Sequence, residues 1–116
     1  MPGNEKNVKL MKDFLDAFNK HDLEAQKKYL ADDAVLVSMT NKRIVGKDKV
    51  IDYIAQFYKD APKVKAVPSG ASFATDEWGA SEWNMTGMGE KDLKGLDLFG
   101  FKGGKISQLG GFSKSA

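Results

Sequence analysis

Asp97 is the residue of this sequence that most suggests chemistry, because it lies inside an apolar strand pattern. The stretch GLDLFGFKGGKI, residues 95–106, is typical of a strand that enters a tight turn. Successive side chains of a strand point to opposite faces, so Asp97 shares one face with Phe99 and Phe101. A carboxylate on an apolar face is costly unless it is hydrogen-bonded or protonated, and functional sites tolerate that cost most readily. Asp97 is therefore either a proton-transfer group or a structural acid bonded to a donor such as Tyr53.

Other residues that could carry chemistry have more ordinary explanations. His21 falls at the junction of two predicted helices, where a turn residue is expected and acid-base catalysis is only a weak alternative. The adjacent acids Asp32 and Asp33 precede a predicted strand, where such pairs more often cap and solvate a turn than bind a metal. Because the sequence has one histidine and no cysteine, a His-rich or Cys-ligated metal site is excluded. We expect no cofactor.

Composition bounds the possible partners and the domain organisation. The chain has 116 residues, which is the length of one domain, and we expect a single domain over residues 1–116. The net charge is +2 and the lysines are scattered, so no nucleic-acid partner is expected. No stretch approaches the roughly 18 apolar residues of a membrane span, and residues 1–9 lack the apolar core of a secretory signal. These patterns predict no membrane partner and a cytoplasmic location.

The elements that must position Asp97 follow a simple order, with helices first and strands later. Apolar spacing and capping residues predict three helices, over residues 7–19, after Asp22 and over residues 47–61. The β-branched and apolar stretches predict strands over residues 34–40, 64–75, 77–87, 94–102 and 105–113. This order indicates an α+β domain with an antiparallel sheet. Helices on one face of a curved sheet would form a cone whose open end holds a pocket.

Four strings support a family resemblance: FLDAFNKHDLEAQKKYLADDAVL, GKDKVIDYIAQFY, SEWNMTG and LDLFGFKGGKI. In this order they resemble the nuclear-transport-factor-2-like superfamily, and within it the SnoaL-like polyketide cyclases and ketosteroid isomerases. The similarity covers about residues 5–113. It implies a cystatin-like cone in which three N-terminal helices pack on a curved antiparallel sheet and enclose a pocket. It also implies either a cyclase- or isomerase-type enzyme or a non-catalytic, dimeric ligand-binding or assembly module.

The resemblance assigns roles to three positions. The strand aspartate that donates a hydrogen bond to the oxyanion in ketosteroid isomerases falls on Asp97. The helix tyrosine that completes the oxyanion hole falls on Phe14, which cannot donate, and the aspartate that moves the proton falls on Ser38. This argues against steroid isomerisation by the familiar route. SnoaL-like cyclases use an acidic cavity residue, which leaves Asp97 as the lone general acid or base.

The same comparison implies a ligand-binding cavity and an association surface. The expected ligand is small and apolar or aromatic, although the aromatic cluster could equally be a filled core. The residues expected to bind the ligand, besides the catalytic Asp97, are Phe14, Phe18, Ser38, Tyr53, Phe57, Ser81, Trp83, Met85, Phe99, Phe101 and Leu109. The opposite sheet face would present Trp78 and Glu82, and the expected partner there is a second copy of the chain.

Overall fold

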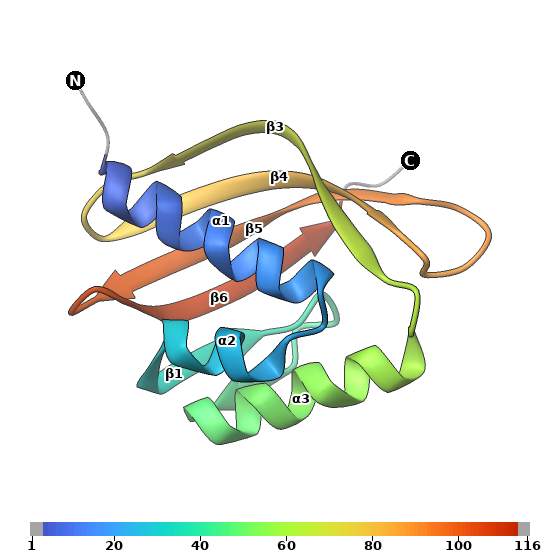
Figure 1. Cartoon of the computed structure of the whole chain (residues 1–116), viewed down its shortest axis with the longest axis horizontal. Coiled ribbons are helices and arrows are strands. Elements are labelled where there is room, and N and C mark those ends of the chain that lie inside the picture. The colour runs from blue at the N-terminus through green and yellow to red at the C-terminus, as the bar shows by residue number, and fades with distance from the viewer. Residues whose placement is uncertain (1–3, 114–116) are drawn as a thin grey trace.

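The computed structural model describes residues 4–113, which form three helices and six strands. The helices are α1 (Glu5–Asn19), α2 (Leu23–Tyr29) and α3 (Lys47–Asp60). The strands are β1 (Leu30–Val37), β2 (Arg43–Val45), β3 (Lys65–Ala74), β4 (Trp78–Thr86), β5 (Leu93–Lys102) and β6 (Lys105–Ser113). The helices lie together on one face of a single curved sheet (Figure 1). The predicted α+β class is confirmed.

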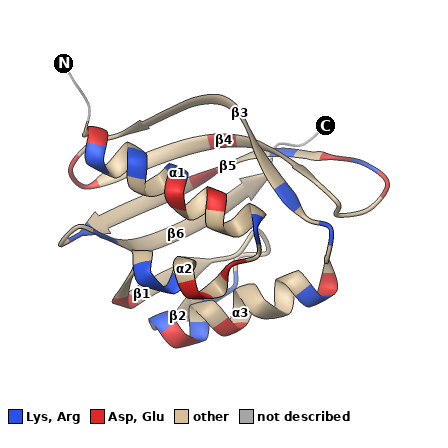
Figure 2. Cartoon of the chain, in the orientation of Figure 1, with Lys and Arg blue, Asp and Glu red and all other residues tan. Residues whose placement is uncertain are grey.

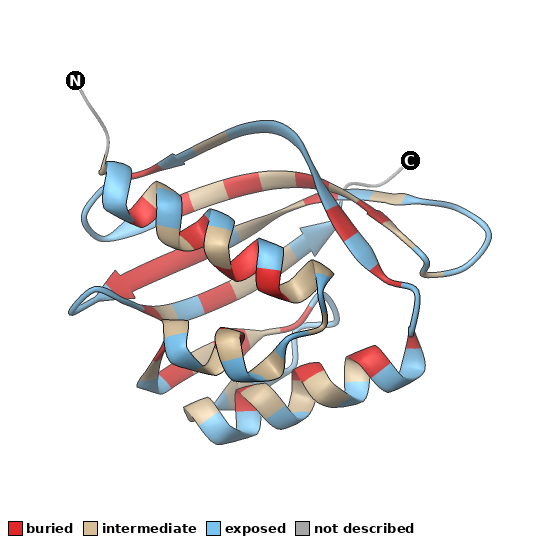
Figure 3. Ribbon diagram, in the orientation of Figure 1, coloured by how far each residue is buried: buried red, intermediate tan, exposed pale blue. Residues whose placement is uncertain are grey.

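The helices begin where the sequence supplies caps, and they bury one stripe each. The Asn4 side chain accepts a hydrogen bond from the backbone N–H of Asn7 at the start of α1, and Asp22 accepts one from Ala25 at the start of α2. Helix α3 starts after Gly46, whose φ of 102° is a conformation that favours glycine. Buried residues recur along the inner faces of α1 and α3 (Figure 3).

The sheet has the order β2-β1-β6-β5-β4-β3 and is mixed rather than antiparallel throughout. Neighbouring strands pair antiparallel except β1 and β6, which pair parallel, with Leu30 opposite Ile106 and Leu36 opposite Leu109. The reason is connectivity, because β1 and β6 are joined through a helix and four other strands rather than by a hairpin. The expectation of a wholly antiparallel sheet was therefore wrong for this one pair.

The first strand differs from its predicted bounds of 34–40. It begins at Leu30, directly after α2, and it ends at Val37 because Ser38 starts a turn. In that turn the backbone N–H of Lys42 donates to the Ser38 hydroxyl at 3.0 Å. The short edge strand β2 after it was not predicted, since three residues are too few to show an alternating pattern.

The core lies between the helices and the inner face of the sheet, and most charged residues lie outside it, with Asp97 on the inner face as an exception. Trp83, Phe99, Met11 and Ile106 are almost fully buried there. Basic and acidic residues are interspersed along the helices and at several strand ends (Figure 2). Among the described residues, no helix is both long enough and apolar enough to cross a membrane.

Candidate functional site

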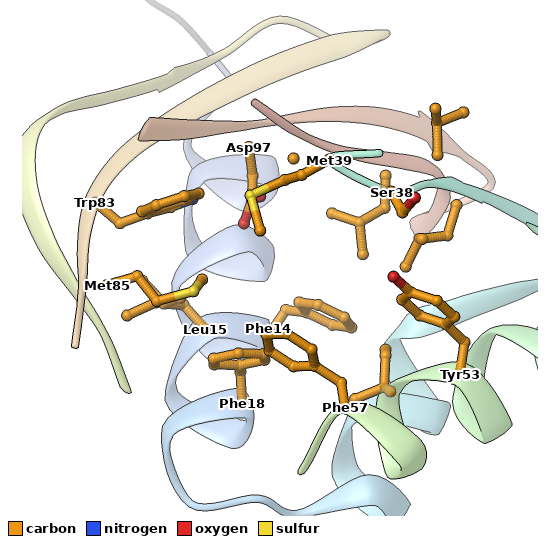
Figure 4. A pocket seen from close by; sticks show the side chains of 16 residues that line it. Phe14, Leu15, Phe18, Ser38, Met39, Tyr53, Phe57, Trp83, Met85 and Asp97 are labelled. Atoms are coloured by element: carbon orange, nitrogen blue, oxygen red, sulfur yellow. The ribbon is translucent and has the colours of Figure 1, made fainter. Parts of the chain in front are cut away.

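A pocket with a cavity volume of about 110 Å³ opens between the inner face of the sheet and helices α1 and α3 (Figure 4). Its walls come from all the large elements except α2, and they are almost entirely apolar. The lining residues are Phe14, Leu15, Phe18, Leu36, Val37, Ser38, Met39, Tyr53, Ile54, Phe57, Ala66, Trp83, Met85, Asp97, Leu109 and Gly111. Its volume is smaller than, but of the same order as, the cavity of about 150 Å³ that is known to hold benzene, and its apolar lining suits a small apolar molecule.

The structure brings most of the sequence-predicted site residues together around this pocket. Asp97 lines it with Phe14, Phe18, Ser38, Tyr53, Phe57, Trp83, Met85 and Leu109. The alternation along β4 and β5 places Trp83 and Asp97 on the inner face, while Trp78 lies on the outer face and is 51% exposed. Whether these residues bind a ligand stays a prediction.

Three predicted residues lie on the inner face but outside the pocket. Phe99 is 1% exposed, meets Phe14 edge-on at 6.3 Å and stacks on Phe101 at 6.3 Å between ring centroids. Phe101 follows a register shift between β5 and β6. Ser81 is buried, and its hydroxyl lies 2.9 Å from that of Ser72. The cone therefore has one filled end and one open end, and position along the strand decides which side chains reach the pocket.

Several lining residues were not predicted, and Met39 and Gly111 are the most informative of these. Both line the pocket beside Asp97, and a Cβ added at Gly111 would lie 3.4 Å from Asp97 Oδ1 and 3.4 Å from Met39 Cγ. The paired glycines Gly110 and Gly111 were the available signal, since glycine inside a strand often marks a close approach of another group. Gly111 thus leaves space next to the carboxyl group.

Asp97 is the acidic group of the pocket and has an unusual proton affinity. It sits in the middle of β5, opposite Ser81 on β4 and Gly111 on β6. Burial disfavours the charged carboxylate and raises the pKa of Asp97 to about 7, while the nearby Trp83 indole N–H acts in the opposite direction. No lysine, arginine or histidine is among the residues lining the pocket. Near neutral pH this carboxyl group can therefore either give or take a proton.

Trp83 brings a hydrogen-bond donor to the same wall. Its side chain is 1% exposed, and its Nε1–H has no hydrogen-bond acceptor among the described residues. The N–H is close enough to Asp97 to favour the charged carboxylate, but the two groups do not reach the geometry of a hydrogen bond. The ring extends toward the Asp97 carboxyl group (Figure 4).

Of the other polar side chains in the pocket lining, Ser38 has structural partners. The Ser38 hydroxyl lies 3.0 Å from that of Thr40 and accepts the backbone N–H of Lys42, so it closes the turn after β1. No hydrogen bond between Asp97 and Tyr53 is found in residues 4–113. The alternative of a structural acid held by this tyrosine therefore has no support here. Asp97, Trp83 and the Tyr53 hydroxyl, for which no hydrogen bond is found within residues 4–113, are thus the polar groups of the pocket left to meet a ligand.

His21 and the acidic pair belong to the scaffold. The His21 ring stacks on Tyr58 at 4.1 Å, and its Nε2 lies 3.0 Å from the carbonyl oxygen of Val64. Asp32 pairs with Lys47 at 2.8 Å, and Asp33 lies 3.7 Å from Lys102. Within the described part of the chain, no group of three or more His, Asp or Glu side chains is placed to hold a metal ion.

Comparisons with known proteins agree with this architecture. A family model described as SnoaL-like domain matches residues 11–109. No curated protein sequence matches the chain significantly.

Three solved structures of bacterial proteins illustrate the similarity of fold. An uncharacterized cystatin fold protein from Novosphingobium aromaticivorans is 18% identical, with a TM-score of 0.80 over 91% of this chain and 97% of that one. A protein from Kribbella flavida, named provisionally as a ketosteroid isomerase, is 21% identical, with a TM-score of 0.84 over 97% and 80%. A protein from Jannaschia sp., named provisionally as a SnoaL-like polyketide cyclase, is 14% identical, with a TM-score of 0.85 over 98% and 89%. At these identities the likeness establishes the cystatin-like fold and not a shared activity.

Proposed function

Because the chain belongs to the SnoaL-like domain family, we propose that it binds a small apolar compound and that Asp97 acts on it as the lone general acid or base. The predicted membership of the nuclear-transport-factor-2-like superfamily is confirmed. The names of two structural neighbours, a cyclase and an isomerase, support a reaction that moves protons on a carbon skeleton.

One observation supports this proposal above the others. Asp97 is a carboxyl group with a pKa of about 7 that faces an apolar pocket containing no basic side chain. A general acid or base works best when its pKa lies near the working pH. A carboxyl group with an ordinary pKa would be almost wholly ionised at pH 7 and could not serve as an acid.

The chemistry must be simpler than that of the ketosteroid isomerases which the sequence resembles. The helix position expected to carry a tyrosine holds Phe14, and the position expected to carry the proton-moving aspartate holds Ser38. Both line the pocket, but neither can take over the missing role, since the Ser38 hydroxyl is engaged in its turn. A single proton transfer at one carboxyl group is what remains.

Deuterium exchange into acetophenone tests the proposal. Acetophenone is a small aromatic ketone whose methyl protons exchange with D₂O through its enol, so exchange followed by NMR reports proton transfer directly. We expect the protein to accelerate this exchange and the Asp97→Asn variant to lose about 100-fold or more of the acceleration, the usual range for a general acid or base. The asparagine has nearly the shape of aspartate, so the variant should still bind the ketone.

The result separates the enzyme from the alternative of a binding module. If the wild-type protein binds acetophenone but does not accelerate exchange at any pH from 5 to 8, the cavity holds ligands without changing them. If exchange is equally fast with Asp97→Asn, then Asp97 is not the catalytic group. An Asp52→Asn variant on the exposed side of α3 serves as the control and should behave like the wild type.

We also propose that the outer face of the sheet pairs with a second copy of the chain. Trp78, Leu98 and Phe112 lie on the outer face of β4, β5 and β6 and are 42–52% exposed. Large apolar side chains gathered on one sheet face are typical of an association surface.

Sedimentation velocity tests the pairing. We expect a dimer at micromolar concentration and a shift to monomer in Trp78→Lys, because a charge would be buried without a partner. Gln56→Lys adds the same charge on the helical side and should remain dimeric. A wild-type monomer at 100 µM would contradict the proposal.

A further inference from the structure

The geometry points to Trp83 as a second ligand-binding group, whose Nε1–H donates to the same ligand oxygen that the Asp97 carboxyl group binds. The ligand is then an apolar molecule with one carbonyl oxygen at its buried end. This inference rests on the proposed function and names the chemical class that the pocket takes.

The first support is a buried donor without an acceptor. In residues 4–113 the Trp83 Nε1–H is one of two fully buried side-chain polar groups with no hydrogen-bond partner. The other, Gln26 Nε2, lies away from the pocket, where the Gln26 Oε1 accepts from the Tyr58 hydroxyl at 2.6 Å. Native proteins rarely leave such a group unsatisfied, because its lost hydration is not compensated. A ligand acceptor would satisfy the indole N–H.

The second support is the orientation of the ring. Trp83 pairs with Gly95 on the neighbouring strand, and a Cβ added at Gly95 would lie 2.6 Å from Trp83 Cη2 and 3.0 Å from Cζ2. Cζ2 belongs to the edge of the indole that also carries the N–H, so this edge faces β5. Asp97 lies two residues further along β5 on the same face. The donor and the carboxyl group therefore converge on one region of the wall.

The third support is the match between these two groups and a carbonyl oxygen. A protonated Asp97 donates one hydrogen bond and Trp83 donates another, while a carbonyl oxygen has two lone pairs to accept them. Apart from the hydroxyl groups of Ser38 and Tyr53, the remainder of the lining is apolar, which suits the hydrocarbon part of the molecule. Trp83 on β4 would thus supply the second donor that Phe14 on α1 cannot.

The corresponding proton transfer is balanced without any further reagent. Asp97 gives its proton to the carbonyl oxygen while water removes one from the adjacent carbon, which yields the enol, a carboxylate and a hydronium ion. The reverse steps restore the ketone and the acid. Two donors on the oxygen stabilise the negative charge that develops there as the C–H bond breaks.

Met39 is the side chain that must move to admit the oxygen. It is 38% exposed and lines the pocket, and its Cγ and the Asp97 Oδ1 would each lie 3.4 Å from a Cβ added at Gly111. Methionine is unbranched and changes rotamer readily, so a shift of its thioether opens the wall without moving the strands.

Indole NMR tests the proposal directly. In ¹⁵N-labelled protein near pH 5.5, each of the two tryptophans gives one N–H signal, and Trp78→Phe identifies that of Trp83. Acetophenone is compared with α-methylstyrene, which has the same shape with CH₂ in place of oxygen. We expect acetophenone to shift the Trp83 N–H signal downfield and α-methylstyrene not to do so. Equal shifts with both compounds would overturn the proposal.

An isosteric replacement provides a second measurement. In the Trp78→Phe background, benzothienylalanine at position 83 exchanges the N–H for sulfur and keeps the ring. We expect its affinity for acetophenone to fall about three- to tenfold, the usual effect of one hydrogen bond, with no change for α-methylstyrene. Unchanged affinity for both compounds would overturn the role of Trp83. Exchange that still depends on Asp97 in that case would leave the proposed function standing.

Discussion

The Asp97→Asn variant is expected to be more stable than the wild type at pH 8 and close to the wild type in stability at pH 4. Burial raises the pKa of Asp97 from 3.8 to about 7, so the folded protein resists the loss of this proton. Asparagine has nearly the same shape and is never charged. A pKa shift of about three units corresponds to at most about 4 kcal/mol of unfolding free energy. We expect Asp97→Asn to gain about 1–4 kcal/mol of unfolding free energy at pH 8.

The direction follows from proton binding in the two states. Below pH 3.8 the Asp97 carboxyl group is protonated whether the chain is folded or unfolded, so it imposes no penalty. Between pH 3.8 and about 7 the unfolded chain has lost this proton while the folded chain keeps it, so the unfolded state is progressively favoured. Above about pH 7 both states are ionised and the penalty stays constant.

Urea denaturation of the two proteins across pH 4 to 9 measures this effect. The difference in unfolding free energy should grow up to about pH 7 and then level off. The Asp52→Asn control, on an exposed helix face, should show no such growth. If Asp97→Asn instead becomes less stable as the pH rises, the carboxylate is held by donors and is a structural acid.

The inner and outer faces of the sheet could be predicted from the sequence because alternation is a local property. Alternation along β4 separates Trp78 from Trp83, which are five positions apart, and the family resemblance supplied the placement of Trp83 and Asp97 on the cavity side. Helix α1 shows an apolar stripe at helical spacing, and Asp22 caps α2 as its residue type predicts. These elements were predicted to within a few residues.

The extent of the pocket could not be predicted, because it depends on packing between distant segments. Phe99 lies on the same face of β5 as Asp97, as predicted. Phe14 of α1 packs against Phe99, however, and Phe99 does not line the pocket. Met39 reaches the pocket because the turn after β1 passes beside Gly111, which is 72 positions later in the chain (111 − 39). The parallel pairing of β1 with β6 joins these segments, and no local pattern encodes it.

The Gly95→Ala variant is expected to lose about 2–3 kcal/mol of unfolding free energy, the cost of overpacking a well-packed site. An added Cβ would lie 2.2 Å from the carbonyl oxygen of Phe112 and 2.6 Å from Trp83 Cη2. The first contact is with backbone on β6, which cannot move away alone, so either the β5–β6 pairing or the indole must shift. Gly110→Ala in the same sheet is the matched control, since its nearest contact would be an ordinary 3.5 Å.

This variant also connects stability to the candidate site. If Gly95 is what allows the Trp83 ring to lie across β5, alanine should move the indole N–H away from Asp97 even in the molecules that remain folded. Urea denaturation gives the stability loss, and the Trp83 N–H signal in the folded protein gives the displacement. We expect Gly95→Ala to change both and Gly110→Ala to change the unfolding free energy by less than about 0.5 kcal/mol. Equal stability of the two variants would show that the sheet absorbs the added methyl group. In that case the position of Trp83 would be set by the helices that cover it rather than by the strand beneath it.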